Sequence, residues 1–314
     1  MLWLAVALLL CLTPINDQDL GFHIAWGRIL QHDFAGARGL LLGQDPSVTV
    51  YAYAYWLYQV IVATLFDHGG PWAIVLFRTA LVMGSFGLAF RVASRLGSSR
   101  WSRAWLLAFG IAAASERFVD RPDVFSHLAW MAGLWILLLH RRDRGVWMLL
   151  PLQVVWVNMH HHFTLLPAAY AAFVIGDFLE TGGRGTGRPR GDPADWPRAG
   201  LVFGSVLLAT CLNPMGPAAW LSQLKLAGVF TGRVSPIPLQ EIISPYAAYA
   251  PFLALWIFRI GMPLCLAAAI LGRKRIGLGA LLALLIPAVL AILARRALCG
   301  YSGLAPSQNH RGAG

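Results

Sequence analysis

Two aspartates and a histidine stand together after the first apolar segment, in the stretch Asn16-Asp17-Gln18-Asp19-Leu20-Gly21-Phe22-His23. Asp19 and His23 are four residues apart, so they share one face of a helix. One explanation is a helix N-terminus, where Asn16 or Asp17 caps the backbone and Asp19 complements the dipole. That explanation accounts for one acid but not for the second acid and the histidine. The stretch therefore predicts catalysis or substrate binding.

A second group combines arginines with acids in the stretch Glu116-Arg117-Phe118-Val119-Asp120-Arg121-Pro122-Asp123. The planar guanidinium group recognises phosphate through paired hydrogen bonds, which makes Arg117 and Arg121 candidate phosphate ligands. A loop held together by salt bridges explains the same residues equally well, and both interpretations stay open.

Three consecutive histidines form the third group, within Asn158-Met159-His160-His161-His162-Phe163. Neutral imidazoles bind metals, but adjacent ones are not expected to face a single ion, so a complete site needs acids from elsewhere. A divalent metal held with the help of Asp17 and Asp19 stays open as a cofactor. Contact of the histidines with a phosphate or sugar and a plain interfacial turn are the other interpretations.

The composition places these groups on an integral membrane protein. Hydrophobic residues make up 58% and charged residues 12% of the chain, against about 25% charge in soluble domains. The apolar residues come in long blocks without the alternation of barrel strands, which predicts an all-α polytopic protein. Four cysteines lie in or beside these blocks and are predicted to be buried thiols: Cys11, Cys211, Cys265 and Cys299.

About nine transmembrane helices are predicted from the apolar blocks, several of them short for the hydrocarbon core. They are expected at about 1–14, 72–91, 102–115, 124–140, 146–158, 163–179, 199–212, 249–271 and 277–296. Arg78 and Arg259 fall inside two of them, where a charge usually faces a cavity or a partner. Both are candidate functional residues, although Arg78 is also placed to extend its side chain to the outer surface.

Two further segments are predicted to lie on the membrane surface. The block Trp56–Phe66 is too short to cross the bilayer. In Asp19–Gln31 the two helical faces differ. One face carries Phe22, Trp26, Ile29 and Leu30, and the opposite face carries Asp19, His23 and Gly27. Residues 15–71 are therefore predicted to form one large outer loop that carries two interfacial helices.

The distribution of charge sets the predicted orientation. Fourteen Lys or Arg residues and five acids lie in the loops 91–103, 140–145, 177–198 and 273–275. Six Lys or Arg residues and nine acids lie in the loops 15–71, 116–123, 159–162 and 213–248. The positive-inside rule makes the first set cytoplasmic, including a flexible basic linker at 180–198. A net charge so divided between loops argues against nucleic acid as a partner.

The membrane domain is predicted to span residues 1–296, and the polar tail 297–314 is expected to be disordered or truncated. Within the outer loop 213–248, which is rich in Pro and Gly, Glu241 is a candidate contact, although a structural cap is the favoured explanation of that loop.

The order of these stretches resembles the C superfamily of membrane glycosyltransferases, and more narrowly the bacterial proteins related to protein mannosyltransferases and lipopolysaccharide-modifying glycosyltransferases. The matching stretches cover most of residues 15–245. They are Asp17-Gln18-Asp19-Leu20-Gly21-Phe22-His23-Ile24-Ala25-Trp26-Gly27-Arg28, Gln44-Asp45-Pro46, Arg121-Pro122-Asp123-Val124-Phe125-Ser126, Trp156-Val157-Asn158-Met159-His160, Leu212-Asn213-Pro214-Met215-Gly216 and Glu241-Ile242-Ile243-Ser244-Pro245. Relatives carry His-Glu-Trp before the second surface helix, where this chain has Ala54-Tyr55-Trp56.

The resemblance implies transfer of a sugar from a polyprenyl-phosphate donor to a hydroxyl of a lipid, polysaccharide or protein acceptor. Asp17 or Asp19 would act as general base, and Asp17 is the predicted one because it is closest to the first apolar segment. Arg28, Arg121 or His160 would stabilise the departing phosphate. The substrate-binding residues implied are His23, Arg28, Asp45, Arg117, Arg121, Asn158, His160, His161 and Glu241. The site would lie on the outer face of a bacterial inner membrane.

Two other functions fit the same sequence. A transporter or flippase of a lipid-linked or anionic substrate would explain Arg78 and Arg259 within apolar segments. An inactive relative that acts as a scaffold would keep the loops without the chemistry. The sequence has no Walker loop, no His-Glu-x-x-His and no Gly-x-Ser-x-Gly, so it gives no support to soluble-nucleotide chemistry or proteolysis.

Overall fold

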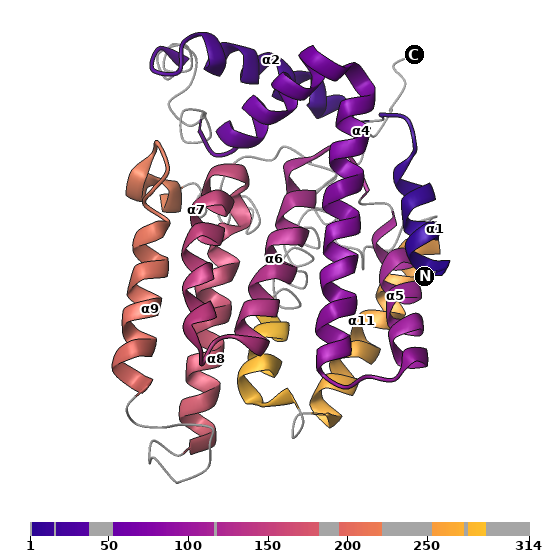
Figure 1. Cartoon of the computed structure of the whole chain (residues 1–314), viewed down its shortest axis with the longest axis vertical. Helices are drawn as coiled ribbons and strands as arrows, with labels where there is room; N and C mark the ends of the chain where they lie inside the picture. Colours follow the sequence, from indigo (N-terminus) through magenta and orange to yellow (C-terminus); the bar gives the residue numbers. More distant parts are fainter. Residues whose placement is uncertain are drawn as a thin grey trace, which may run out of the picture.

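The computed structural model describes residues 2–15, 17–37, 53–115, 118–181, 195–221, 253–272 and 276–286. Within these ranges every regular element is a helix, as the apolar blocks predict. Most helices run side by side as a bundle, and two helical segments lie across one end of it (Figure 1). The predicted all-α fold is therefore confirmed for the described part of the chain.

The bundle helices follow the predicted apolar blocks closely. They are α1 (Leu2–Cys11), the second part of α4 (Trp56–Arg95), α5 (Arg100–Ala114), α6 (Pro122–Leu139), α7 (Leu149–Met159), α8 (Leu165–Thr181), α9 (Asp195–Ala209) and α11 (Leu253–Leu271). Short 3-10 turns occur at η3 (Arg144–Met148), η4 (His161–Thr164) and η5 (Gly216–Ala218). From α4 to α9, successive helices run in alternating directions along the bundle (Figure 1).

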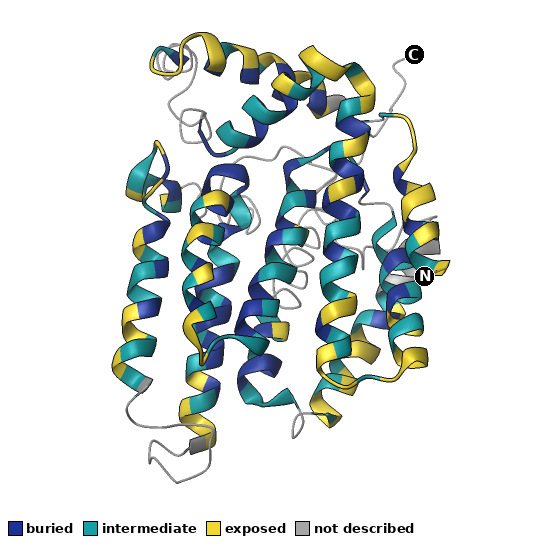
Figure 2. Ribbon diagram, viewed as in Figure 1, coloured by how far each residue is buried: buried dark blue, intermediate teal, exposed yellow. Residues whose placement is uncertain are grey.

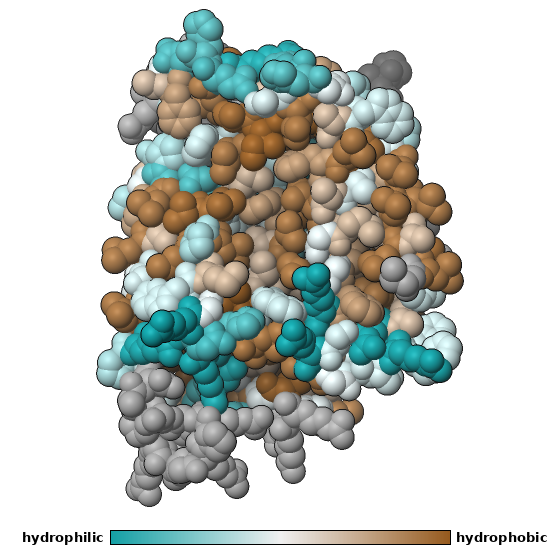
Figure 3. Space-filling model, viewed as in Figure 1, coloured by the Kyte–Doolittle hydropathy of each residue, from teal (hydrophilic) through white to brown (hydrophobic). Residues whose placement is uncertain are grey.

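Three helical stretches are long and apolar enough to cross a membrane: Trp56–Arg95, Pro122–Leu139 and His161–Glu180. Three shorter apolar helices accompany them: Leu2–Cys11, Trp196–Ala209 and Arg259–Leu271. These lengths are consistent with a membrane protein. They support three spans among the described residues, and the predicted nine stays a prediction. Figure 3 shows the matching surface, a broad hydrophobic belt between hydrophilic ends.

The bundle buries one apolar face of each helix and leaves another apolar face outward. Trp156 of α7 and Leu166 and Phe173 of α8 are buried in the largest core cluster, which also includes residues of α6 and α9. Large apolar side chains such as Trp105 and Leu208 remain exposed on the outside of the bundle. Buried and exposed residues accordingly alternate around the helices (Figure 2). Apolar residues on both faces are what a lipid environment favours.

The end of the bundle is covered by α2 (Gln18–His32) and by the first part of α4. A kink divides α4 at Gly70, whose φ of 61° is readily adopted only by glycine, and Pro71 starts the descending half. The block Trp56–Phe66 thus lies across the bundle end, as predicted, but it continues through this kink into the bundle helix (Figure 1).

The two faces of α2 are arranged differently from the prediction. His23 and Gly27, of the predicted polar face, lie on the buried side with Leu20 and Ile24, while Asp19 of the same face is exposed. Of the predicted apolar face, Leu30 is buried but Phe22 is exposed. The reason is a close approach between α2 and α4. A Cβ on Gly27 would lie 2.0 Å from the carbonyl oxygen of Gln59, so glycine is required where the helices touch.

We expect Gly27→Ala to destabilise the protein by about 1–3 kcal/mol, because the added methyl group would push α2 away from α4. Gly21→Ala is the matched control on the same helix. Nothing lies within 4 Å of a Cβ at Gly21, and alanine is the better helix former by about 1 kcal/mol. Thermal unfolding in detergent measures both variants, and equal stability of the two would contradict the close helix contact.

Candidate functional site

The predicted acids, arginine and histidines meet where the two surface segments rest on the bundle. The contributing parts are the start of α2, the start of α4, the start of α6 with the segment before it, and the turn between α7 and α8. Each is the end of a helix, so the side chains are aimed by helix packing. α2 packs on α4, and α4 packs on α6 and α7.

Arg121 joins the two aspartates of the first outer loop. Its Nε donates to Asp17 Oδ2 over 2.6 Å, and its NH2 group lies 3.0 Å from Asp19 Oδ2. Asp17 is also the N-cap of α2, because its Oδ1 accepts from the backbone N–H of Asp19. The side chain of Asp17 is only 2% exposed, whereas that of Asp19 is 55% exposed. Capping and salt bridging, both left open by the sequence, therefore occur together.

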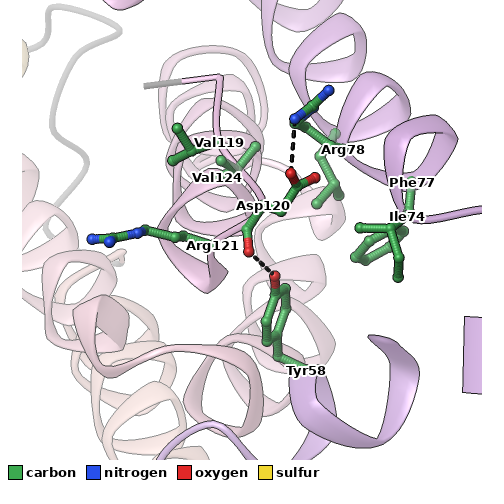
Figure 4. A pocket seen from close by; sticks show the side chains of 9 residues that line it. Tyr58, Ile74, Phe77, Arg78, Val119, Asp120, Arg121 and Val124 are labelled. Atoms are coloured by element: carbon green, nitrogen blue, oxygen red, sulfur yellow. Dashed lines mark hydrogen bonds and ion pairs between the residues drawn. The ribbon is translucent and has the colours of Figure 1, made fainter. Parts of the chain in front are cut away.

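The segment that carries Arg121 is fixed by a buried ion pair between Arg78 and Asp120. The Arg78 NH1 group donates to Asp120 Oδ2 over 2.8 Å, and the two side chains are 3% and 0% exposed. Arg78 NH2 also donates to the carbonyl oxygens of Cys11 and Thr13. Figure 4 shows Asp120 facing Arg78, with the side chain of Arg121 pointing away from that pair.

Tyr58 completes this anchor, because its hydroxyl donates to the carbonyl oxygen of Asp120 over 2.7 Å (Figure 4). The interaction of Arg78 with Asp120 answers one question left by the sequence. Arg78 neither extends to the surface nor stands alone in the bundle, because a carboxylate and two carbonyl groups surround its guanidinium group.

His23 lies in the buried interface between α2 and α4. Its ring makes edge contacts with Tyr55 and Tyr58, at centroid distances of 5.9 and 5.3 Å, and its Nδ1 is 3.3 Å from Gln59 Nε2. Burial lowers the pKa of His23 to about 4, although the carboxylates of Asp19 and Asp17 act in the opposite direction. His23 is therefore a neutral imidazole at physiological pH.

The three histidines between α7 and α8 pack against one another and against Tyr55. The Tyr55 ring stacks on His160 at 5.6 Å, and its hydroxyl lies 2.6 Å from His161 Nδ1. His160 Nδ1 is 2.7 Å from Ser126 Oγ, which also accepts from the indole N–H of Trp156. Burial and the neighbouring imidazoles hold the pKa of His160 well below its usual range.

The three consecutive histidines bring their rings close together, which the sequence did not predict. One ring nitrogen from each of His160, His161 and His162 lies within 4.8 Å of the others. The reason is local backbone conformation: His160 is extended, with φ −159° and ψ 148°, and the next residues form the 3-10 turn η4. A change from extended to 3-10 backbone brings consecutive side chains to one side of the turn.

Asn158 holds the bundle together below the site. Its Oδ1 accepts from the indole N–H of Trp56 over 2.5 Å and from Asn213 Nδ2 over 3.2 Å. Its Nδ2 donates to the carbonyl oxygens of Val154 and Leu212. With both ends of a buried amide engaged, Asn158 ties the start of α4 to α7 and to the chain after α9. This arrangement favours a structural role over the predicted contact with substrate.

Apart from Asn158, the predicted site residues divide into three groups. Those brought together at the bundle end are Asp17, Asp19, His23, Arg121, His160 and His161. Arg28 is not among them, because it pairs with Asp67 on the exposed side of α2 and lies 5.9 Å from the ring centre of Phe66. Outside the described residues lie Asp45, Arg117 and Glu241.

Sequence reasoning missed Tyr55 and Ser126 as members of the site. It noted His162 and Asp123 within their groups but did not include them among the substrate-binding residues. Tyr55 stands where the resemblance described above leads one to expect His-Glu, and it contacts two histidines. The only signal for it was this departure from the family pattern. Ser126 stands one turn after Pro122 in α6, within a matching stretch, so its place in the motif was the available signal.

No protein-family model matches the chain, and no curated protein and no solved structure shows significant similarity to it.

Acidification is expected to destabilise the protein in part through His23. Because its folded pKa of about 4 lies below the ordinary value of 6.5, the unfolded chain binds the proton more readily. Its stabilising contribution is present above about pH 6.5 and is lost as the pH falls toward 4. Wild type should therefore lose up to about 3 kcal/mol more than His23→Gln between pH 7.5 and pH 4. Equal losses in unfolding experiments on both proteins would exclude this contribution.

Removal of one partner from the Arg78–Asp120 pair is expected to destabilise the protein strongly. Asp120→Asn leaves a guanidinium group that is 3% exposed without its counter-charge, at a cost of about 3–5 kcal/mol. Asp67→Asn is the matched control, because it removes a surface ion pair, and it should have little effect. Chemical denaturation in detergent compares the two. An Asp120→Asn variant as stable as Asp67→Asn would show that the buried pair anchors nothing.

Proposed function

We propose that the protein is a membrane glycosyltransferase that moves a sugar from a polyprenyl-phosphate donor to an acceptor hydroxyl. The observation that carries the proposal is the contact of Asp17 and Asp19 with Arg121 at the end of an apolar helix bundle. Base and phosphate-binding cation thus stand together at the level where a lipid-linked donor presents its head group.

Asp19 is the better general base of the two aspartates. Both oxygens of Asp17 are engaged, one with the N–H of Asp19 and one with Arg121, and its side chain is 2% exposed. Asp19 is 55% exposed and uses Oδ2 with Arg121, so an acceptor hydroxyl can approach it. In place of the base predicted from the sequence, Asp17 then has the role of holding Arg121 and the first turn of α2.

In the proposed reaction the acceptor oxygen forms a bond to the anomeric carbon as the bond from that carbon to the lipid phosphate breaks. The hydroxyl proton passes to the Asp19 carboxylate, and the anomeric centre inverts in a single step. Charge develops on the departing phosphate, which Arg121 stabilises through charge-assisted hydrogen bonds. The two carboxylates hold the partly exposed Arg121 in position before substrate binds, so little reorganisation is needed.

The membrane supplies the donor in this proposal. The hydrophobic belt below the surface segments suits the polyprenyl chain, whose phosphate would then reach Arg121 (Figure 3). The proposal keeps the predicted nine spans and places the bundle end with α2 on the outer face of the inner membrane. Acceptors of three kinds remain within it: a lipid, a polysaccharide or a protein.

The transporter alternative draws on Arg78 and Arg259 within apolar helices. The pairing of Arg78 with Asp120 and two carbonyl groups accounts for its charge without a translocation path. Scaffold function is favoured by the replacement of His-Glu by Ala54-Tyr55. We favour the enzyme because neither alternative requires an exposed carboxylate beside an arginine.

Sugar transfer from a panel of radiolabelled polyprenyl-phosphate sugars, with purified protein in liposomes, tests the proposal. Asp19→Asn should lower the turnover number by about 100-fold or more, and Arg121→Gln should lower it too. Asp143→Asn is the control, because Asp143 pairs with His140 beyond the opposite end of α6.

Transfer lost in Asp17→Asn but retained in Asp19→Asn would return the role of base to Asp17. Absence of transfer by folded wild-type protein with every donor would contradict the enzyme. Flipping of a lipid-linked sugar under the same conditions would then establish the transporter.

A further inference from the structure

The proposed transferase chemistry uses Asp17, Asp19 and Arg121 on one side of the bundle end. It gives no role to the turn that carries the three histidines. His160, His161 and His162 crowd together, with ring centroids 4.1 to 4.4 Å apart. One nitrogen from each lies within 4.8 Å of the others. Three imidazoles in a buried turn are costly to pack unless something joins them, because each needs hydrogen-bond partners.

In two of the histidines the Nδ1 atom already has a hydroxyl partner, an arrangement that metal-bound histidines commonly show. Ser126 Oγ lies 2.7 Å from His160 Nδ1, and Tyr55 Oη lies 2.6 Å from His161 Nδ1. Both hydroxyl oxygens can accept from an Nδ1–H, and this tautomer leaves the lone pair on Nε2. Metal-bound histidines commonly donate their second ring nitrogen to such a partner, which fixes ring orientation.

One acid at the start of α6 interacts electrostatically with the histidine turn and has an unused carboxylate oxygen. Asp123, in the first turn of α6, is close enough to His162 for electrostatic interaction. Its Oδ1 is buried and has no hydrogen-bond partner among the described residues. A buried carboxylate oxygen without a partner is expensive, and a cation at the histidine turn would satisfy it.

We propose that His160, His161 and His162, with Asp123 as fourth ligand, form a site for a divalent transition metal of the zinc class. Three nitrogen ligands and one oxygen ligand are a common tetrahedral zinc set. Zinc–nitrogen bonds of about 2.0–2.1 Å in a tetrahedral site place the nitrogens about 3.3 Å apart. The rings must therefore close from their present separations of up to 4.8 Å, and Asp123, which is outside that group of ligand atoms, must move toward them.

Metal content and affinity test the site without any measurement of sugar transfer, so its failure leaves the proposed function untouched. Protein purified with a tag that lacks histidine would be stripped with chelator and loaded with zinc. Mass spectrometry of the bound metal should give one zinc per chain. Cobalt in its place should show the visible absorption of a four-coordinate ion.

His161→Gln/His162→Gln should abolish stoichiometric zinc, and Asp123→Asn should weaken it. His68→Gln, a change at an exposed histidine of the first part of α4, should bind as wild type does. Tyr55→Phe removes the partner of His161 and should weaken binding about 10-fold or more.

Folded wild-type protein that retains neither zinc nor cobalt would overturn the proposal. So would unchanged affinity in His161→Gln/His162→Gln. If that double variant does not fold, unchanged affinity in Tyr55→Phe and Asp123→Asn together would overturn it instead.

Discussion

The buried ion pair between Arg78 and Asp120 fixes the part of the chain from which the site is built. It joins α4 to the segment before α6, and the carbonyl groups of Cys11 and Thr13 add the end of α1. A paired charge at such depth is stable only with good geometry and further hydrogen bonds, which these carbonyls provide. Arg121 follows directly in sequence, so the pair also sets where the next guanidinium points.

α2 and the first part of α4 close the site from the other side. The two segments pack on each other at very short range. Gly27 allows backbone contact with Gln59, and Gly70 lets α4 turn from the surface into the bundle. This path places Tyr55 and Trp56 against the end of α7 and the histidine turn that follows it. The Tyr55 hydroxyl and the Trp56 indole N–H form hydrogen bonds with His161 and Asn158. These bonds connect the start of α4 to the end of α7 and the turn after it.

The two halves of the bundle end have different electrostatic character. On one side two carboxylates share a single arginine, and one of the carboxylates is open to solvent. On the other side the imidazoles of His23 and His160 are buried and neutral. The first side suits acid–base chemistry and phosphate binding. The neutral imidazole nitrogens of the second side suit metal binding. A division of this kind permits one small surface to hold both a reacting group and a cation.

The sequence by itself determined the helical class and the positions of the bundle helices, because long apolar blocks permit few other structures in lipid. It also separated Trp56–Phe66, which lies across the end of the bundle, from the bundle helices. It also marked Asp17, Asp19, Arg121 and His160. The tertiary structure alone decided their partners. Arg121 and Asp17 are 104 residues apart, and Tyr55 and His161 are 106 apart. Such contacts depend on which helices pack together and how closely, and local periodicity carries no information about either. The burial of His23 was not predictable for the same reason, since it follows from the close contact of Gly27 with Gln59.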